Sequence, residues 1–149
     1  MNINRIIFAP LALAAFLPST APAQGLQFYS LTPCRALDTR LGTPNPLQVS
    51  VIRAVTIKGV CGVPATARAV SLNLTVTQAT FDGFVTLWAF GGAYPATSNI
   101  NFTAADPALA NAAVIPLAAG TPDLNAVYGN NNIPSQTTHL VLDVTGYYQ

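Results

Sequence analysis

The sequence predicts an all-β protein, a two-sheet antiparallel β-sandwich of the jelly-roll or immunoglobulin-like kind, with about seven or eight strands and one disulfide. Beyond residue 24, apolar residues recur at every second position, and the spacing of amphipathic helices is nearly missing. The alternating segments are short and are separated by Gly, Pro, Asn and Asp, which end strands and form turns. With such spacing, neighbouring strands are expected to pair through short connections.

Residues 1–23 have the composition of an export signal. Arg5 supplies a positive charge, residues 6–17 form an apolar stretch, and an Ala-Pro-Ala cleavage site ends at Ala23. The apolar stretch contains a proline and is shorter than the roughly 20 residues of a membrane-spanning helix. We therefore expect cleavage after Ala23 and a single extracellular β-sandwich domain over residues 24–149; an uncleaved anchor is the alternative.

The exported part is expected to carry no net charge. The chain has 6 Lys and Arg against 5 Asp and Glu, and removal of Arg5 leaves 5 against 5. A neutral surface with few charges favours association, so the expected partners are other copies of the chain or other surface components. The chain has no basic stripe to neutralise phosphates, which argues against nucleic acid, and no apolar run beyond residue 24 reaches membrane-spanning length.

The clearest strand is expected at residues 70–77, where apolar side chains alternate with Ser, Asn and Thr. Residues 84–90 are apolar on both faces, which predicts a strand that is central in its sheet or covered by a partner. A single helical turn is compatible with residues 107–111. The remaining strands are expected, in chain order, at residues 49–58, 98–103, 113–117, 124–128 and 139–148.

Cys34 and Cys61 are the two cysteines of the chain. In an oxidising compartment such a pair is expected to form one disulfide, which stabilises a loop of this length by about 3 to 4 kcal/mol. The alternatives are two buried thiols or a metal site, which needs four ligands. Since the chain has no metal-ligand spacing, phosphate-binding glycine loop or calcium-binding loop, we expect neither a metal nor a cofactor.

Charged residues gather at Arg35, Asp38 and Arg40, and Asp143 interrupts an apolar run near the other end of the chain. We expect an arginine to form a bidentate pair with Asp38 or Asp143 and so to connect the first and last segments. The catalytic alternative is that the two aspartates act as an acid/base couple. Nearby arginines would lower both pKa values, which is unfavourable for a general acid, so we do not expect an enzyme.

Three aromatic residues are candidates for ligand contact: Trp88, Tyr94 and Tyr128. Trp88 is a core residue if both faces of its strand are buried. If one face is open, Trp88 heads an aromatic strip suited to stacking on a sugar ring or on another protein. The second interpretation leads to the alternative function of a carbohydrate-binding module that has a polysaccharide as its partner.

The segment before Cys34 alternates loosely, and Leu26 and Phe28 are its apolar side chains. It is suited to adding as an edge strand to a neighbouring copy, or to pairing within its own sheet. Together with the absence of net charge, this segment leads to our first functional hypothesis. We expect a secreted structural or interaction module that assembles with itself by N-terminal strand addition or attaches to the cell surface.

Two motifs mark the ends of the predicted domain. Residues 28–40 read FYSLTPCRALDTR, and residues 142–148 read LDVTGYY. This arrangement resembles a family of secreted bacterial β-sandwich modules that open with "TPCRLLDTR" and close with "LDVxGYF" or "LDVxGYY". The resemblance covers essentially the whole exported part and implies an extracellular module of uncharacterised activity, with no catalytic residues to carry over. The chain departs from the pattern at Ala36, where Leu is usual, and in an Asn-rich turn near Gly129, and we expect it to be a stand-alone copy.

Overall fold

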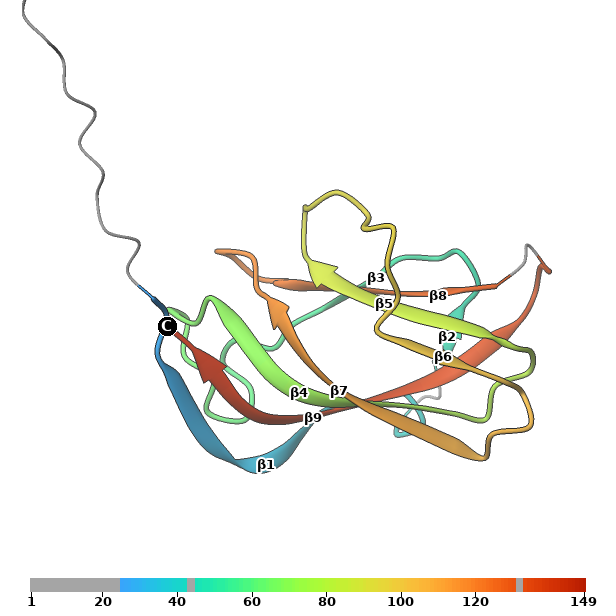
Figure 1. The fold of residues 1–149 in the computed structure, drawn as a ribbon, viewed down its shortest axis with the longest axis horizontal. Helices are drawn as coiled ribbons and strands as arrows, with labels where there is room; N and C mark the ends of the chain where they lie inside the picture. The colour runs from blue at the N-terminus through green and yellow to red at the C-terminus, as the bar shows by residue number, and fades with distance from the viewer. Residues whose placement is uncertain (1–24, 43–44, 131–132) are drawn as a thin grey trace, which may run out of the picture.

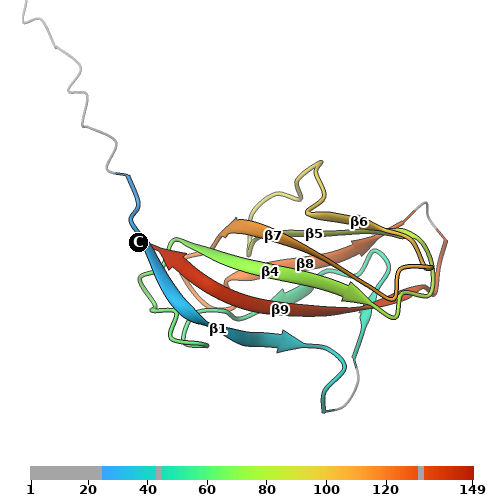
Figure 2. The same cartoon turned by 60° about the horizontal axis from the view of Figure 1, so that its bottom comes forward.

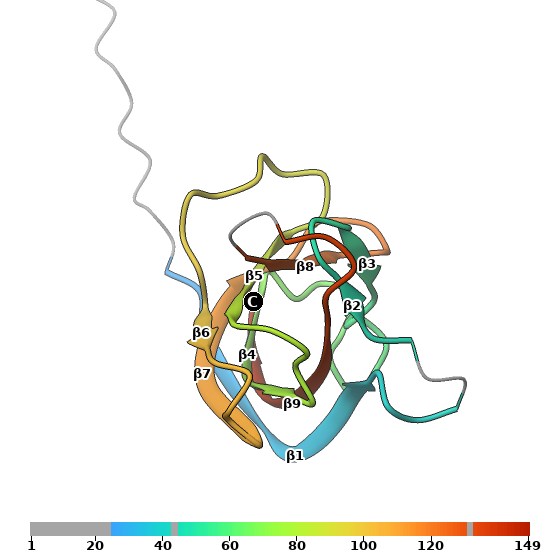
Figure 3. The same ribbon diagram turned by 90° about the vertical axis from the view of Figure 1, so that its right-hand side faces the viewer.

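Two antiparallel sheets face each other in the computed structural model, which confirms the predicted all-β sandwich (Figures 1 and 3). The structure describes residues 25–42, 45–130 and 133–149. The predicted export signal and its cleavage site lie outside the described residues. The strands are β1 (Phe28–Asp38), β2 (Leu47–Gln48), β3 (Arg53–Val55), β4 (Ala69–Thr77), β5 (Gly83–Ala89), β6 (Ile100–Phe102), β7 (Ala108–Pro116), β8 (Leu124–Gly129) and β9 (Thr137–Tyr148).

The larger sheet has five strands in the order β1-β9-β4-β7, with β2 also paired to β9, and Figure 2 shows the first four side by side. The smaller sheet has the order β3-β8-β5-β6. Among the described strands, β5 and β6 are the one pair of chain neighbours that are hydrogen-bonded to each other. The expected pairing of neighbouring strands is therefore wrong for most of the chain, because connections such as that from β4 to β5 pass from one sheet to the other.

The hydrophobic core lies between the two sheets, and the alternation of β4 and β9 builds much of it. On β4 the apolar side chains predicted to share one face are all buried, as are their counterparts on β9. Tyr128 of β8 is the largest fully buried side chain. The central core residues are Val70, Leu72, Leu74, Val76, Val85, Leu87, Leu124, Ala126, Tyr128, Leu140, Leu142 and Val144.

Residues 107–111 do not form the helical turn with which their sequence is compatible, because most of them belong to strand β7. β7 pairs with β4 in one unbroken antiparallel register along its whole length. Helix propensity is a weak preference, and nine consecutive pairings with a central strand outweigh that of the alanines. The strand expected at residues 49–58 is also shorter than predicted, since only Arg53–Val55 has extended ladder pairing there.

Strand β1 is an edge strand with a bend in its middle (Figure 1). Its register against β9 shifts between Ser30 and Cys34, which is the mark of a β-bulge. At the end of this shift, Cys34 forms the predicted disulfide with Cys61, and the two Cα atoms are 5.6 Å apart. Just before β1, Gln27 and Gln149 exchange two backbone hydrogen bonds of 2.9 and 3.1 Å, so the ends of the described chain lie side by side.

Candidate interaction surfaces

Arg35 and Asp143 connect strand β1 to strand β9, where they are direct cross-strand partners. Arg35 Nε and Nη2 donate to Asp143 Oδ1 and Oδ2 at 2.9 and 3.2 Å, and Arg35 Nη1 donates to Asp38 Oδ2 at 3.2 Å. Arg40 Nε and Nη2 donate to the two oxygens of Asp38 at 2.8 and 2.6 Å. The predicted ion pairs are therefore present, and their bidentate geometry fixes the bend of β1 against β9.

Asp38 lies at the centre of this cluster, and its side chain is only 2% exposed. Its carboxylate accepts hydrogen bonds from both arginines and from the backbone N–H of Arg40. The hydrogen bond from the Arg40 side chain is the main reason that the pKa of Asp38 lies well below its ordinary value. A carboxyl group that stays ionised is a poor general acid, so the geometry supports a structural interpretation of the cluster.

The three aromatic candidates do not form a common surface. Tyr128 is fully buried on the inner face of β8, and its hydroxyl donates to the carbonyl oxygen of Phe81 at 3.0 Å. Trp88 is 7% exposed, whereas Tyr94 is 54% exposed. Of the two alternatives for Trp88, the structure shows the core residue, and the candidate stacking role of Tyr128 is corrected, because buried rings are not accessible to a ligand. Tyr94 is the one of the three that presents its ring to solvent.

The loop over residues 90–99 rises above the smaller sheet (Figures 1 and 3). It also contacts the buried Trp88. Trp88 Nε1 donates to the carbonyl oxygen of Gly92 at 3.0 Å, and Thr86 Oγ1 donates to that of Thr97 at 3.0 Å. Asn99 Oδ1 accepts a hydrogen bond of 2.6 Å from a backbone N–H of β5. This explains why β5 is apolar on both faces: one face meets the core and the other lies under its own loop.

A groove runs between this loop and strands β5 and β8. It consists of two cavities of about 300 and 310 Å³, and both are lined by Phe84 and Tyr94. Phe84 lies across Gly129 on the neighbouring strand, where a Cβ atom would come within 2.2 Å of the phenylalanine ring. Tyr94 was recognisable from the sequence as an aromatic candidate. The place of Phe84 in the groove was not, because it depends on the pairing of β5 with β8.

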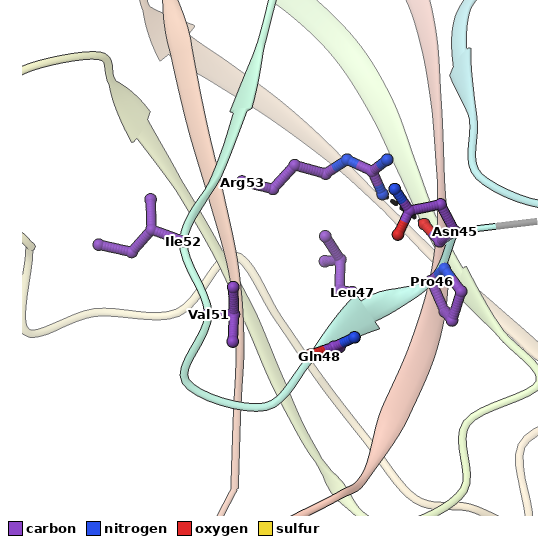
Figure 4. A pocket seen from close by; sticks show the side chains of 7 residues that line it. All are labelled: Asn45, Pro46, Leu47, Gln48, Val51, Ile52 and Arg53. Carbon is purple, nitrogen blue, oxygen red and sulfur yellow. Dashed lines mark hydrogen bonds between the residues drawn. The ribbon is translucent and has the colours of Figure 1, made fainter.

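A separate cavity of about 200 Å³ lies beside strands β2 and β3 (Figure 4). Arg53 extends across it and donates a hydrogen bond to the backbone carbonyl oxygen of Asn45. Leu47 points into the space between them, whereas Ile52 points away. The one charged side chain that lines this cavity is thus already engaged with the chain itself, so the cavity is less suited to a ligand than the groove.

The N-terminal segment with Leu26 and Phe28 pairs with β9 of its own sheet. Gln27 is hydrogen-bonded to Gln149, and Phe28 is the cross-strand partner of Tyr148. Of the two alternatives for this segment, the structure shows pairing within the sheet. Both apolar side chains are nevertheless about half exposed, and the outer side of β1 remains a sheet edge.

Strand β7 provides the other edge of the larger sheet; the sequence predicted its last part, at residues 113–117, but not its length or its edge position. Its nine residues include no charged side chain, and its one proline is the last residue, Pro116. Most of β7 is exposed, including Leu109 and Val114. The edge strands β3, β6 and β1 carry features that hinder pairing with another chain. Strands β3 and β6 have three residues each, and β1 has register shifts, Pro33 and charged residues.

Comparison of the chain with known protein families, curated proteins and solved structures finds no match. The resemblance to secreted bacterial modules therefore rests on the sequence motifs alone. Within the part of the chain that the structure describes, no helix is long and apolar enough to cross a membrane. Nor do three or more His, Cys, Asp or Glu side chains gather there in a way that would hold a metal ion.

Proposed function

We propose that the protein is an extracellular structural module that associates with a second copy of itself through the edge of strand β7. The observation that carries this proposal is the edge itself: nine consecutive residues in unbroken register, most of them exposed, and without charge or bulge. The outward backbone N–H and C=O groups of such a strand are ready to pair with another strand. The proposal gives the protein a role in contact rather than in catalysis.

Two β7 strands are well suited to pair with each other. Antiparallel pairing about a two-fold axis brings the same surface of each copy together, so the contact is self-complementary. Ala110 and Ala112 lie on the outer face of the larger sheet, opposite Thr75 and Asn73 of β4. These small, uncharged side chains oppose no like charge across the contact, and the two five-stranded sheets would join into one continuous sheet.

Charge and cysteine chemistry support the same role. Residues 24–149 contain equal numbers of basic and acidic residues, so association meets little long-range repulsion. The Cys34–Cys61 disulfide is compatible with an oxidising, extracellular environment, in agreement with the expected export signal.

The test is a charge substitution on the β7 edge. Ala110→Lys places a positive charge on the β7 edge of both copies in a two-fold β7 pair, whereas Ser30→Lys places the same charge on the β1 edge as a matched control. Sedimentation of the disulfide-bonded protein over a range of concentrations should show a dimer for the wild type and for Ser30→Lys. The Ala110→Lys variant should dissociate at a concentration about tenfold higher or more.

Two outcomes would overturn the proposal. The first is a wild-type protein that stays monomeric at every concentration. The second is dissociation caused by Ser30→Lys but not by Ala110→Lys, which would move the contact to the N-terminal strand with Leu26 and Phe28. Circular dichroism of each variant verifies that the β-sandwich is retained.

A further inference from the structure

We propose that the groove between the loop over residues 90–99 and strands β5 and β8 binds an uncharged carbohydrate chain, with the ring of Tyr94 as its stacking surface. The groove lies on the outer face of the smaller sheet, whereas β7 belongs to the larger one. The carbohydrate site is therefore independent of the proposed association through β7, and either can fail without the other.

The size and shape of the groove suit an extended ligand. Its two cavities of about 300 and 310 Å³ meet at Phe84 and Tyr94, which line both. Each is near the lower end of the range of about 300 to 1,000 Å³ that is common for small-molecule sites. Two adjoining spaces that share an aromatic wall can accept consecutive rings of one chain, one on each side of the shared wall.

The chemistry of the lining selects for a neutral ligand rich in hydroxyl groups. The polar side chains that line it carry only hydroxyl or amide groups, and no carboxylate, amine or guanidinium is among them. Hydroxyl and amide groups both donate and accept hydrogen bonds, as sugar hydroxyls do. The polar lining residues other than tyrosine are Ser50, Thr97, Ser98, Asn101 and Asn130.

The stacking surface is held in place before any ligand arrives. The rings of Tyr94 and Trp88 have centroids 5.3 Å apart and planes at 72°, so at least one face of the Tyr94 ring is left uncovered by Trp88. Trp88 is in turn fixed by its hydrogen bond to Gly92. Across the groove, the Asn130 side chain both donates to and accepts from the backbone of Ile133. A prearranged site loses less conformational entropy on binding.

Other ligand classes fit the groove less well. A nucleic acid or an acidic polysaccharide needs Arg or Lys to balance its charge, and neither lines the groove. A proline-rich peptide also docks on aromatic grooves, but its backbone offers mainly carbonyl acceptors. Such a peptide would leave the acceptor capacity of the hydroxyl side chains unused, whereas a sugar hydroxyl both donates and accepts.

The test is affinity electrophoresis of the disulfide-bonded protein in native gels that contain one polysaccharide each. The neutral probes are hydroxyethylcellulose, xylan, galactomannan and mixed-linkage β-glucan, and alginate is the acidic probe. We expect at least one neutral polysaccharide to retard the wild type. Tyr94→Ala should weaken that binding about tenfold or more, while Tyr94→Phe, which keeps the ring, should retain most of it.

Phe90→Ala is the matched control. Phe90 is an exposed aromatic residue of the same loop as Tyr94, but Phe90 lines neither cavity. It should bind as the wild type does. The proposal is overturned if none of the neutral probes retards the wild type, if alginate alone does so, or if Phe90→Ala weakens binding as much as Tyr94→Ala. Circular dichroism shows whether each variant keeps the fold, and Tyr94→Phe provides the comparison in which folding is least disturbed.

Discussion

The ring of Phe28 lies directly over Gly146. A Cβ atom at position 146 would come within 2.4 Å of Phe28 Cε2 and within 2.6 Å of the backbone oxygen of Tyr29. The missing side chain therefore allows the first part of β1 to lie against β9, where the Phe28 ring also contacts that of Tyr148 at a centroid distance of 5.1 Å. The close approach of Phe28 and Tyr29 thus explains why the closing motif has a glycine at position 146.

Gly146→Ala should displace the beginning of β1 from β9, because a backbone atom of β1 cannot move aside as a flexible side chain can. Such overpacking costs about 1 to 3 kcal/mol of unfolding free energy. Hydrogen exchange should accelerate at residues 27–30. Gly120→Ala is the control, since a Cβ atom there meets nothing within 4 Å, and equal exchange rates in the two variants would contradict the prediction.

Removal of the disulfide in the double variant Cys34→Ala, Cys61→Ala should lower the free energy of unfolding by about 3 to 4 kcal/mol. The bridge closes a loop with a sequence separation of 27 residues, and the chain-entropy relation gives this magnitude. Urea unfolding of the double variant and the oxidised wild type measures the difference. A change below about 1 kcal/mol would show that other contacts hold β1 in place.

Asp38→Asn should destabilise the protein at neutral pH and do so less at acidic pH. The pKa of Asp38 is lowered in the folded state, chiefly by its hydrogen bond with Arg40. Its contribution to stability is therefore present above the unfolded-state pKa of about 3.9 and is lost as the pH falls from there through the folded-state value. Urea unfolding of the wild type and Asp38→Asn at about pH 7 and about pH 3 tests this prediction. A loss of unfolding free energy that is the same at both pH values would contradict it.

Asp123→Ala should be among the more damaging substitutions of a polar residue. The buried Asp123 carboxylate accepts backbone hydrogen bonds from Ile57 at 3.0 and 3.2 Å and from Lys58 at 2.9 Å. Truncation leaves two backbone N–H groups without acceptors, at about 1 to 3 kcal/mol each. Thermal unfolding should show a much larger loss than for Asp82→Ala, whose exposed side chain accepts one backbone hydrogen bond, and equal losses would refute the argument.

Alternation of apolar and polar residues was sufficient to predict the all-β class, the central strand β4 and its buried face. It predicted only the last part of β7, at residues 113–117, because the Ala-rich beginning of this strand has little local preference for the extended state and its pairing with β4 decides the outcome. The order of strands in the sheets could not be predicted from this alternation either. It depends on connections that cross between sheets, and these are set by the packing of the whole core.

The ion pairs of Arg35 were predictable because three charged residues lie together at positions 35–40 of a chain with few charges, and Asp143 interrupts an apolar run. The burial of Trp88 was one of two alternatives that the sequence left open, and what could not be predicted is the loop over residues 90–99 that folds back over β5. The groove has the same origin. Phe84, Tyr94 and Asn130 come from three segments that carry no common motif, and only the tertiary structure brings them together.

The paired Gln27 and Gln149 have a mechanical consequence. Tension applied across the two ends of the described chain would break the hydrogen bonds between β1 and β9 one after another, starting at Gln27 and Gln149. It would not load all of these hydrogen bonds at the same time, as shear would. Resistance to pulling would then be low. A module built in this way is better suited to attachment at one end than to a position in which both ends bear a pulling force.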